Sequence, residues 1–101
     1  NIFPADIERL AESAYGVRRG AVVAFGVTLP HRPEEIRIVA ETVEDYPDDV
    51  SREIRRQIAR NVFNATGLSP TVLLVHKGAI PKTPSGKIRH GAAKETYGKA
   101  S

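Results

Sequence analysis

The sequence predicts an α+β domain built on a small three-stranded sheet with helices packed on it. Three observations favour this class. The chain has 101 residues, 41% of them hydrophobic and 27% charged, which is the composition of one soluble globular domain. Three short apolar runs rich in β-branched residues alternate with segments whose apolar residues recur every third or fourth position. Glycine and proline separate these segments, so each is expected to be a distinct strand or helix.

The first predicted element is a helix that begins at Pro4, because a proline ring suits the first helical turn. Its apolar stripe consists of Ile7, Leu10, Ala11 and Ala14. Gly16 is expected to end this helix.

A turn at Arg18-Arg19-Gly20 is expected to lead into a first strand over residues 21–27. A second strand follows, in which Ile36, Ile38 and Ala40 alternate with Arg37 and Glu41. This alternation predicts a strand with one buried face and one solvated face. The segment between the two runs breaks regular structure, so the strands are expected to pair as a hairpin.

A second helix is predicted after Pro47, ending at Gly67, with apolar residues at every fourth position (Val50, Ile54, Ile58 and Val62). Residues 71–75 are predicted to form the third strand, and a short helix is expected to begin near Ile88. This order favours two helices on one side of the sheet. The opposite side is expected to be shielded by the chain that precedes Asn1 in a larger protein, because so small a core is only marginally stable alone.

Charge is unevenly distributed, although the net charge is only +3. The first 75 residues carry eleven acidic residues and nine arginines but no lysine, whereas residues 76–101 carry six basic residues and one acidic residue. A nucleic-acid-binding module would place aromatic side chains among its basic ones. Only Tyr97 meets this requirement, so a basic nucleic-acid-binding module is a remote alternative.

Other features of the composition exclude further classes. The chain has no cysteine, which excludes a disulfide framework, and its three histidines have no ligand spacing, so no metal site is expected. No apolar run approaches the roughly 20 residues of a membrane-spanning helix. A reducing, cytoplasmic setting is expected. The chain also lacks methionine and opens almost directly on a helix, so we expect it to be part of a larger protein.

Residues 79–89 have the most distinctive chemistry in the chain. Pro81 and Pro84 restrict the backbone, and Gly86 supplies one flexible joint next to Lys87. This pattern predicts an exposed loop that carries a long-armed cation able to reach an oxyanion. The alternative is a solvated turn without chemistry. A nucleotide-binding P-loop is excluded, because Pro81 stands where that motif requires glycine.

Residues 81–89, Pro-Lys-Thr-Pro-Ser-Gly-Lys-Ile-Arg, resemble the last core motif of the adenylate-forming superfamily, which includes acyl-CoA synthetases, fatty acyl-AMP ligases and nonribosomal adenylation domains. The motif is usually Pro-(Lys/Arg)-Thr-x-Ser-Gly-Lys-(Ile/Leu/Val)-x-Arg. This chain departs from it because Arg89 falls one place early, His90 stands at an often basic position, and Pro84 stands where a small residue is commoner.

The opening of the chain, Asn-Ile-Phe-Pro-Ala-Asp-Ile-Glu, resembles the segment just past the interdomain hinge of these enzymes, most closely that of fatty acyl-AMP ligases. The resemblance therefore covers essentially the whole chain. It implies that residues 1–101 are the small C-terminal domain of a larger enzyme, whose N-terminal adenylation domain and hinge lie outside this sequence.

The resemblance implies that Lys87 is the catalytic lysine of adenylation, stabilising negative charge as a fatty acid carboxylate attacks the α-phosphorus of ATP. Thr83, Ser85 and Gly86 would shape the loop near the ATP phosphates. ATP, Mg²⁺ and the acyl chain would be bound mainly by the N-terminal adenylation domain. In the family the small domain then swings and withdraws this lysine. The acceptor would be an acyl carrier protein, with coenzyme A, the acceptor of acyl-CoA synthetases, as the alternative.

Other polar residues have structural explanations beside functional ones. Arginines on the second helix are either a solvated face or a docking surface for an acidic carrier protein; they are Arg52, Arg55, Arg56 and Arg60. His76 and His90 are expected at the surface, because the sequence shows no carboxylate partner for either. The acids near the start of that helix are expected to be solvated: Glu44, Asp45, Asp48 and Asp49. Lys77 and Lys82 are expected to have no catalytic role.

A last alternative is a freestanding interaction domain descended from such an enzyme. The chain that precedes Asn1 in the natural protein would distinguish it from a catalytic domain, because only the latter needs an adenylation domain.

Overall fold

The structure is a computed structural model that describes residues 3–98. Asn1 and Ile2 of the opening motif and Lys99 of the basic segment lie outside the described residues. The elements are α1 (Pro4–Glu12), β1 (Val17–Val27), β2 (Glu35–Thr42), α2 (Asp48–Thr66), β3 (Thr71–Val75) and α3 (His90–Tyr97). Three helices and a three-stranded sheet confirm the predicted α+β class.

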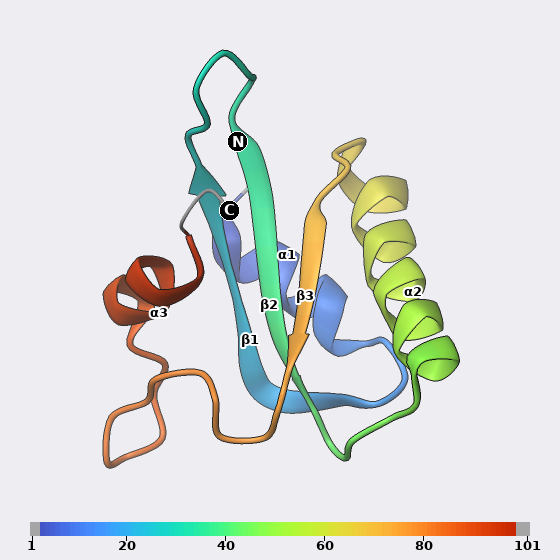
Figure 1. Cartoon of the computed structure of the whole chain (residues 1–101), viewed down its shortest axis with the longest axis vertical. Coiled ribbons are helices and arrows are strands. Elements are labelled where there is room, and N and C mark those ends of the chain that lie inside the picture. The colour runs from blue at the N-terminus through green and yellow to red at the C-terminus, as the bar shows by residue number, and fades with distance from the viewer. Residues whose placement is uncertain (1–2, 99–101) are drawn as a thin grey trace.

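The strands lie in the order β1-β2-β3 (Figure 1). Strands β1 and β2 pair antiparallel as the predicted hairpin, whereas β2 and β3 pair parallel. Parallel neighbours need a crossover connection, and α2 provides it. The carboxyl ends of β2 and β3 therefore meet at one edge, from which the chain continues toward the segment that contains Lys87.

Helices α1 and α2 cover one face of the sheet, as predicted. Their buried side chains pack on every second residue of β1 and β2 in one core cluster; its members include Ile7, Ala11, Val22, Ala24, Ile38, Ala40, Ile54, Ile58 and Val62. In α2 the spacing of four residues places Ile54, Ile58 and Val62 on the buried side, and Gly67 ends the helix with a φ of 76°.

The opposite face of the sheet is covered by the chain's own C-terminal segment. Val23 and Val39 pack there against Ile80 and Ala93, all four fully buried or nearly so. Figure 1 shows α3 and the loop before it on the side of the sheet away from α2. The expectation that another part of the protein shields this face is therefore wrong for the area that α3 and its loop occupy.

The predicted turn at Arg18-Arg19-Gly20 is wrong, because β1 begins at Val17 and runs through these residues. The register of β1 against β2 shifts between Val17 and Val22, so the strand continues through an irregularity. Gly20 adopts a φ of 72° within it, which only glycine tolerates readily.

Strand β1 is an edge strand, and two carboxylates of α1 lie along its open side. Glu12 Oε2 accepts a hydrogen bond from the Gly20 N–H at 2.7 Å, and Glu8 Oε2 accepts one from the Ala24 N–H at 2.9 Å. These backbone groups would otherwise have no partner in the sheet.

The prediction of a solvated face on the second strand is also wrong. The Arg37 side chain is only 11% exposed and binds Glu35 and the backbone carbonyl of Tyr97. Glu41 has no exposed surface at all. The alternation of residue types is real, but the segment after β3 folds back over the face that carries these polar side chains.

Within residues 3–98, no helix combines the length and the apolar character that crossing a membrane requires.

Candidate active-site loop

Residues 81–89 form a hydrogen-bonded hairpin. Lys82 and Ile88 are antiparallel bridge partners. The Arg89 N–H donates to the Pro81 carbonyl at 2.9 Å, and the Thr83 N–H donates to the Lys87 carbonyl at 2.7 Å. The loop predicted from its prolines and glycine is therefore closed at its base.

The tip of the hairpin is shaped by the residues between Thr83 and Lys87. The Gly86 N–H donates to the Thr83 carbonyl at 2.9 Å, and Gly86 has a φ of 89°, a conformation that favours glycine. The Thr83 hydroxyl lies 3.0 Å from the Ser85 hydroxyl and accepts a hydrogen bond from the Lys87 N–H at 3.1 Å. The side chains named from the motif are thus brought together in one turn.

Lys87 is exposed at this turn. Its ammonium has no hydrogen bond or ion pair to any residue in the described range 3–98. Its main chain is held on both sides by Thr83, so a free cation stands on a restrained backbone. Such a group can bind an oxyanion that approaches from outside the domain.

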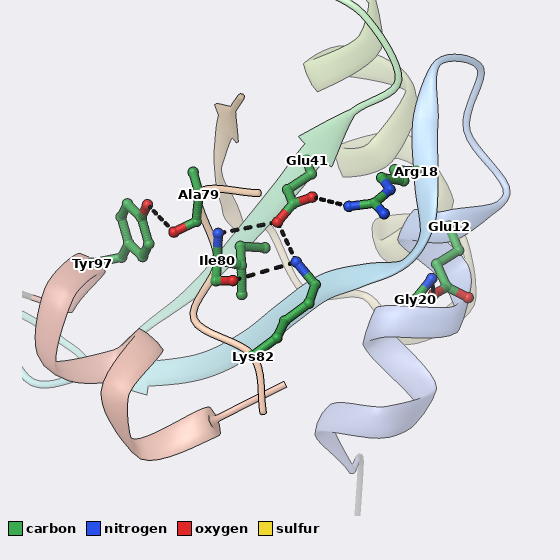
Figure 2. A network of polar contacts seen from close by, with 8 residues as sticks. All are labelled: Glu12, Arg18, Gly20, Glu41, Ala79, Ile80, Lys82 and Tyr97. Atoms are coloured by element: carbon green, nitrogen blue, oxygen red, sulfur yellow. Dashed lines mark hydrogen bonds and ion pairs between the residues drawn. The ribbon is translucent and has the colours of Figure 1, made fainter. Parts of the chain in front are cut away.

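Lys82 differs from Lys87, because its ammonium is engaged. It forms an ion pair with Glu41 Oε2 and donates to the Ile80 carbonyl at 3.3 Å (Figure 2). The Ile80 N–H also donates to Glu41 Oε2, at 3.0 Å, and Arg18 Nη1 lies 2.8 Å from Oε1. Lys82 therefore has a structural role that the sequence does not reveal, and its expected lack of a catalytic role stays a prediction.

The pKa of Glu41 is lowered from its ordinary 4.5 to about 2. Burial alone would raise this pKa, since it disfavours the charged carboxylate. Hydrogen bonds from the backbone near Gly78, from Lys82, from Arg18 and from Ile80 outweigh burial and stabilise the charge. Glu41 is thus an ionised carboxylate inside the domain over the whole physiological pH range.

Sequence reasoning missed Glu41 and its partners, because Arg18, Glu41 and Lys82 are far apart along the chain. The available signal was an acidic residue directly after the apolar run of the second strand, at a position that sheet packing can bury.

Both histidines also have carboxylate partners that the sequence does not reveal. His76 Nδ1 lies 2.8 Å from Asp45 Oδ1, and both side chains are exposed. His90 Nε2 lies 3.5 Å from Glu8 Oε2. The surface location predicted for both histidines is confirmed, since both are exposed.

Three of the four arginines of α2 border a shallow depression of about 280 Å³, which is lined by Arg52, Arg55, Arg56, Ala59, Pro70 and Val72. Arg52, Arg56 and Arg60 are exposed, and Arg55 is half-buried. Arg56 pairs with Glu53 at 3.4 Å. This surface combines guanidinium groups with an apolar floor.

Within residues 3–98, no three histidine, aspartate or glutamate side chains converge.

No protein-family model matches the chain. Individual proteins do. A protein of Mycobacterium tuberculosis named as a ligase, Rv1013, is 41% identical over 92 residues, which are 88% of this chain and 16% of that protein. The M. tuberculosis protein named long-chain-fatty-acid–AMP ligase FadD30 is 38% identical over 104 residues, covering 97% of this chain and 17% of that protein. A Caulobacter vibrioides protein named as an acyl-CoA synthetase is 33% identical over 98 residues, covering 96% of this chain and 17% of that protein.

Solved structures agree with these relatives. A multidomain structure from a keto acid-selecting NRPS module, described as containing adenylation, ketoreductase and pseudo Asub domains, matches 96% of this chain over 8% of its own length, with a TM-score of 0.85 at 28% identity. A structure from work on fatty acyl-adenylate ligases of Escherichia coli and Legionella pneumophila matches 97% of this chain with a TM-score of 0.76 at 29% identity, over 17% of that chain. The chain thus spans 16 to 17% of the length of the relatives named above. Its sequence and its fold are those of the C-terminal domain of adenylate-forming enzymes, and its relatives include proteins named as fatty-acid–AMP ligases and acyl-CoA synthetases.

Proposed function

We propose that this chain is the mobile C-terminal domain of a fatty acyl-AMP ligase, in which Lys87 is the catalytic lysine of adenylation. The observation that carries the proposal is the free ammonium of Lys87 on a hairpin whose backbone is closed by hydrogen bonds. The Lys87 ammonium is exposed and unpaired within residues 3–98, whereas the Lys82 ammonium at the base of the same hairpin is bound to Glu41.

In this proposal Lys87 acts electrostatically, by stabilising negative charge. A fatty acid carboxylate oxygen bonds to the α-phosphorus of ATP, the bond from that phosphorus to the β-phosphate bridge breaks, and pyrophosphate leaves. Negative charge gathers as the two anions meet, so a positioned ammonium lowers the energy of the transition state. In this proposal the N-terminal adenylation domain binds ATP, Mg²⁺ and the acyl chain, and residues 83–86 keep the hairpin tip in shape beside the phosphates.

An acyl carrier protein is the proposed acceptor, with coenzyme A as the second candidate. The similarity to the fatty-acid–AMP ligase supports the first acceptor, and the similarity to the acyl-CoA synthetase supports the second. The test supplies the full-length enzyme with ATP, a fatty acid and either acceptor. We expect acylated carrier protein as the main product, and efficient formation of acyl-CoA would favour the second candidate.

The chain by itself should not form acyl-adenylate. The Lys87 side chain is exposed and its ammonium has no polar partner among residues 3–98, so we expect the groups that bind ATP and fatty acid to lie outside this chain. A pyrophosphate-release assay on the purified 101 residues should give the background rate. Turnover above background would contradict the assignment as one domain of a larger enzyme.

Charge reversal on α2 should slow transfer to the carrier protein. The exposed Arg52, Arg56 and Arg60 repeat at every fourth position of the helix and would steer an acidic partner. With all three changed to Glu in the full-length enzyme, we expect acyl transfer to fall about tenfold at low ionic strength through slower association, with adenylation unchanged.

The matched control reverses three exposed arginines on other elements, Arg9, Arg19 and Arg32, and so changes the net charge equally. Transfer by this control should stay close to wild type. An equal loss in both variants would mean that the α2 arginines form an ordinary solvated face and not a docking surface for the carrier protein.

A further inference from the structure

Glu41 is a fully buried carboxylate for which the proposed chemistry has no use. It lies near the end of β2, two residues after Val39, and it accepts a hydrogen bond from the Ile80 N–H. Val39 and Ile80 both belong to the buried cluster between the sheet and α3. A carboxylate in such a place is costly unless charged partners and hydrogen bonds compensate it. A domain that needed only a filled core at this point would be served equally well by an apolar side chain.

The two carboxylate oxygens of Glu41 bind different parts of the chain. Oε1 accepts from Arg18 of β1, a contact within the sheet. Oε2 accepts from the Ile80 N–H and from Lys82, both in the segment that leads into the hairpin. Figure 2 shows Glu41 reaching from its strand toward these two partners on one side and Arg18 on the other. Glu41 Oε2 therefore binds groups at the base of the hairpin.

Contacts at the base of the hairpin determine its orientation relative to the rest of the domain. Lys82 bridges Ile88, the residue directly after Lys87, so a shift of Lys82 moves both strands of the hairpin. Neighbouring contacts hold the same base: Ile80 is buried, and the Tyr97 hydroxyl donates to the Ala79 carbonyl at 3.1 Å. The tip carries Lys87 away from these contacts, so a small rotation at the base displaces the ammonium.

We propose that Glu41 is a positioning residue for adenylation: through Lys82 and the Ile80 N–H it holds the 82–88 hairpin in the one orientation that lets Lys87 meet the phosphate. This inference rests on the proposed catalytic role of Lys87 and adds a second residue, on a different strand, to the machinery of that step. Lys82 links the two residues.

The test compares two variants of the same ion-pair network in the full-length enzyme. Lys82→Met removes the ammonium that ties the hairpin to Glu41, and Arg18→Met removes the other cation from the same carboxylate without touching the hairpin. We expect Lys82→Met to lower kcat for adenylation at least about tenfold, with KM for ATP and fatty acid little changed, since misplacing a catalytic group affects the chemical step. Arg18→Met should stay within about twofold of wild type.

Two further measurements separate positioning from general loss of structure. Transfer from preformed acyl-adenylate should be unchanged in Lys82→Met, and Lys82→Arg, which keeps the charge, should recover most of the rate. In a Lys87→Ala background, Lys82→Met should cost nothing more, because the group being positioned is gone. An additional loss of the same size in that background would overturn the inference, as would equal losses in Lys82→Met and Arg18→Met.

Glu41→Gln provides a second variant if Lys82→Met does not fold, and the same pattern is expected of it. The outcomes also distinguish this inference from the proposed function. Full activity of Lys87→Ala would overturn the catalytic role itself, whereas a slow Lys87→Ala together with a fast, folded Lys82→Met or Glu41→Gln would overturn only the positioning role.

Discussion

We expect Lys87→Ala in the full-length enzyme to form acyl-adenylate at least about 100-fold more slowly than wild type, the cost of losing one preorganised electrostatic donor, about 3 kcal/mol of transition-state stabilisation. The measurement is pyrophosphate release at saturating ATP and fatty acid. The thermal midpoint of unfolding should barely move, because the Lys87 side chain is exposed and makes no polar contact with residues 3–98. Transfer from preformed acyl-adenylate should be largely preserved, because the family resemblance implies that the small domain swings and withdraws this lysine before that half-reaction.

The controls for this variant follow from the structure. Lys82 is unsuitable, although it lies in the same basic segment, because removing it breaks an ion pair with buried Glu41. Lys77 and Lys94 are exposed, and alanine at either position should leave adenylation near wild type. Equal losses at positions 77, 87 and 94 would mean that bulk charge is responsible, and an unaffected Lys87→Ala would leave the hairpin without a catalytic role.

The second large effect is expected in the stability of the chain at low pH. The unfolded state takes up a proton on Glu41 near the ordinary pKa of 4.5, whereas the folded state resists protonation down to about 2. Glu41 therefore adds stability that is complete above about pH 5 and disappears as the pH falls toward 2. The shift corresponds to about 3 kcal/mol of unfolding free energy.

Urea unfolding of the 101-residue chain at a series of pH values measures this contribution. We expect Glu41→Gln to be less stable than wild type by about 3 kcal/mol at pH 7, and the two to converge toward pH 2. The control, Glu53→Gln, changes a glutamate whose side chain is 66% exposed and should track wild type throughout. A gap between Glu41→Gln and wild type that stayed constant from pH 7 to pH 2 would contradict the ionised, buried state of Glu41.

Local patterns were sufficient for much of this fold. In α2, four apolar positions spaced by four and a glycine at the end predict both the buried face and the C-terminus, and the structure has Gly67 in the left-handed conformation there. The hairpin of β1 and β2 and the strand at residues 71–75 were equally predictable from apolar runs and their breaks. In each case the determining interactions lie within one element or between adjacent ones.

The incorrect predictions concern residues whose structure depends on contacts between segments that are distant in the sequence. Arg18 and Gly20 have the composition of a turn, but pairing with β2 draws them into a strand and confines the special conformation to Gly20. Glu41 sits on the polar side of an alternating strand, and only the return of residues 79–97 over that side converts a solvent position into a buried one. The motif around Lys87 was recognisable from sequence, whereas the anchor beneath it was not, because Lys82 and Glu41 are 41 positions apart.

The carboxylates of Glu8 and Glu12 along β1 have a consequence for how this domain coexists with its neighbours. An outer strand with unoccupied N–H groups is a template on which another chain can add a strand, and repeated addition leads to aggregation. Here the Gly20 and Ala24 N–H groups are already bound by side chains of the same domain. With these donors occupied, β1 offers fewer free N–H groups to a strand of another molecule. This protection would matter most if the domain moves relative to a partner domain, as the proposed function requires, because movement would expose its surfaces repeatedly.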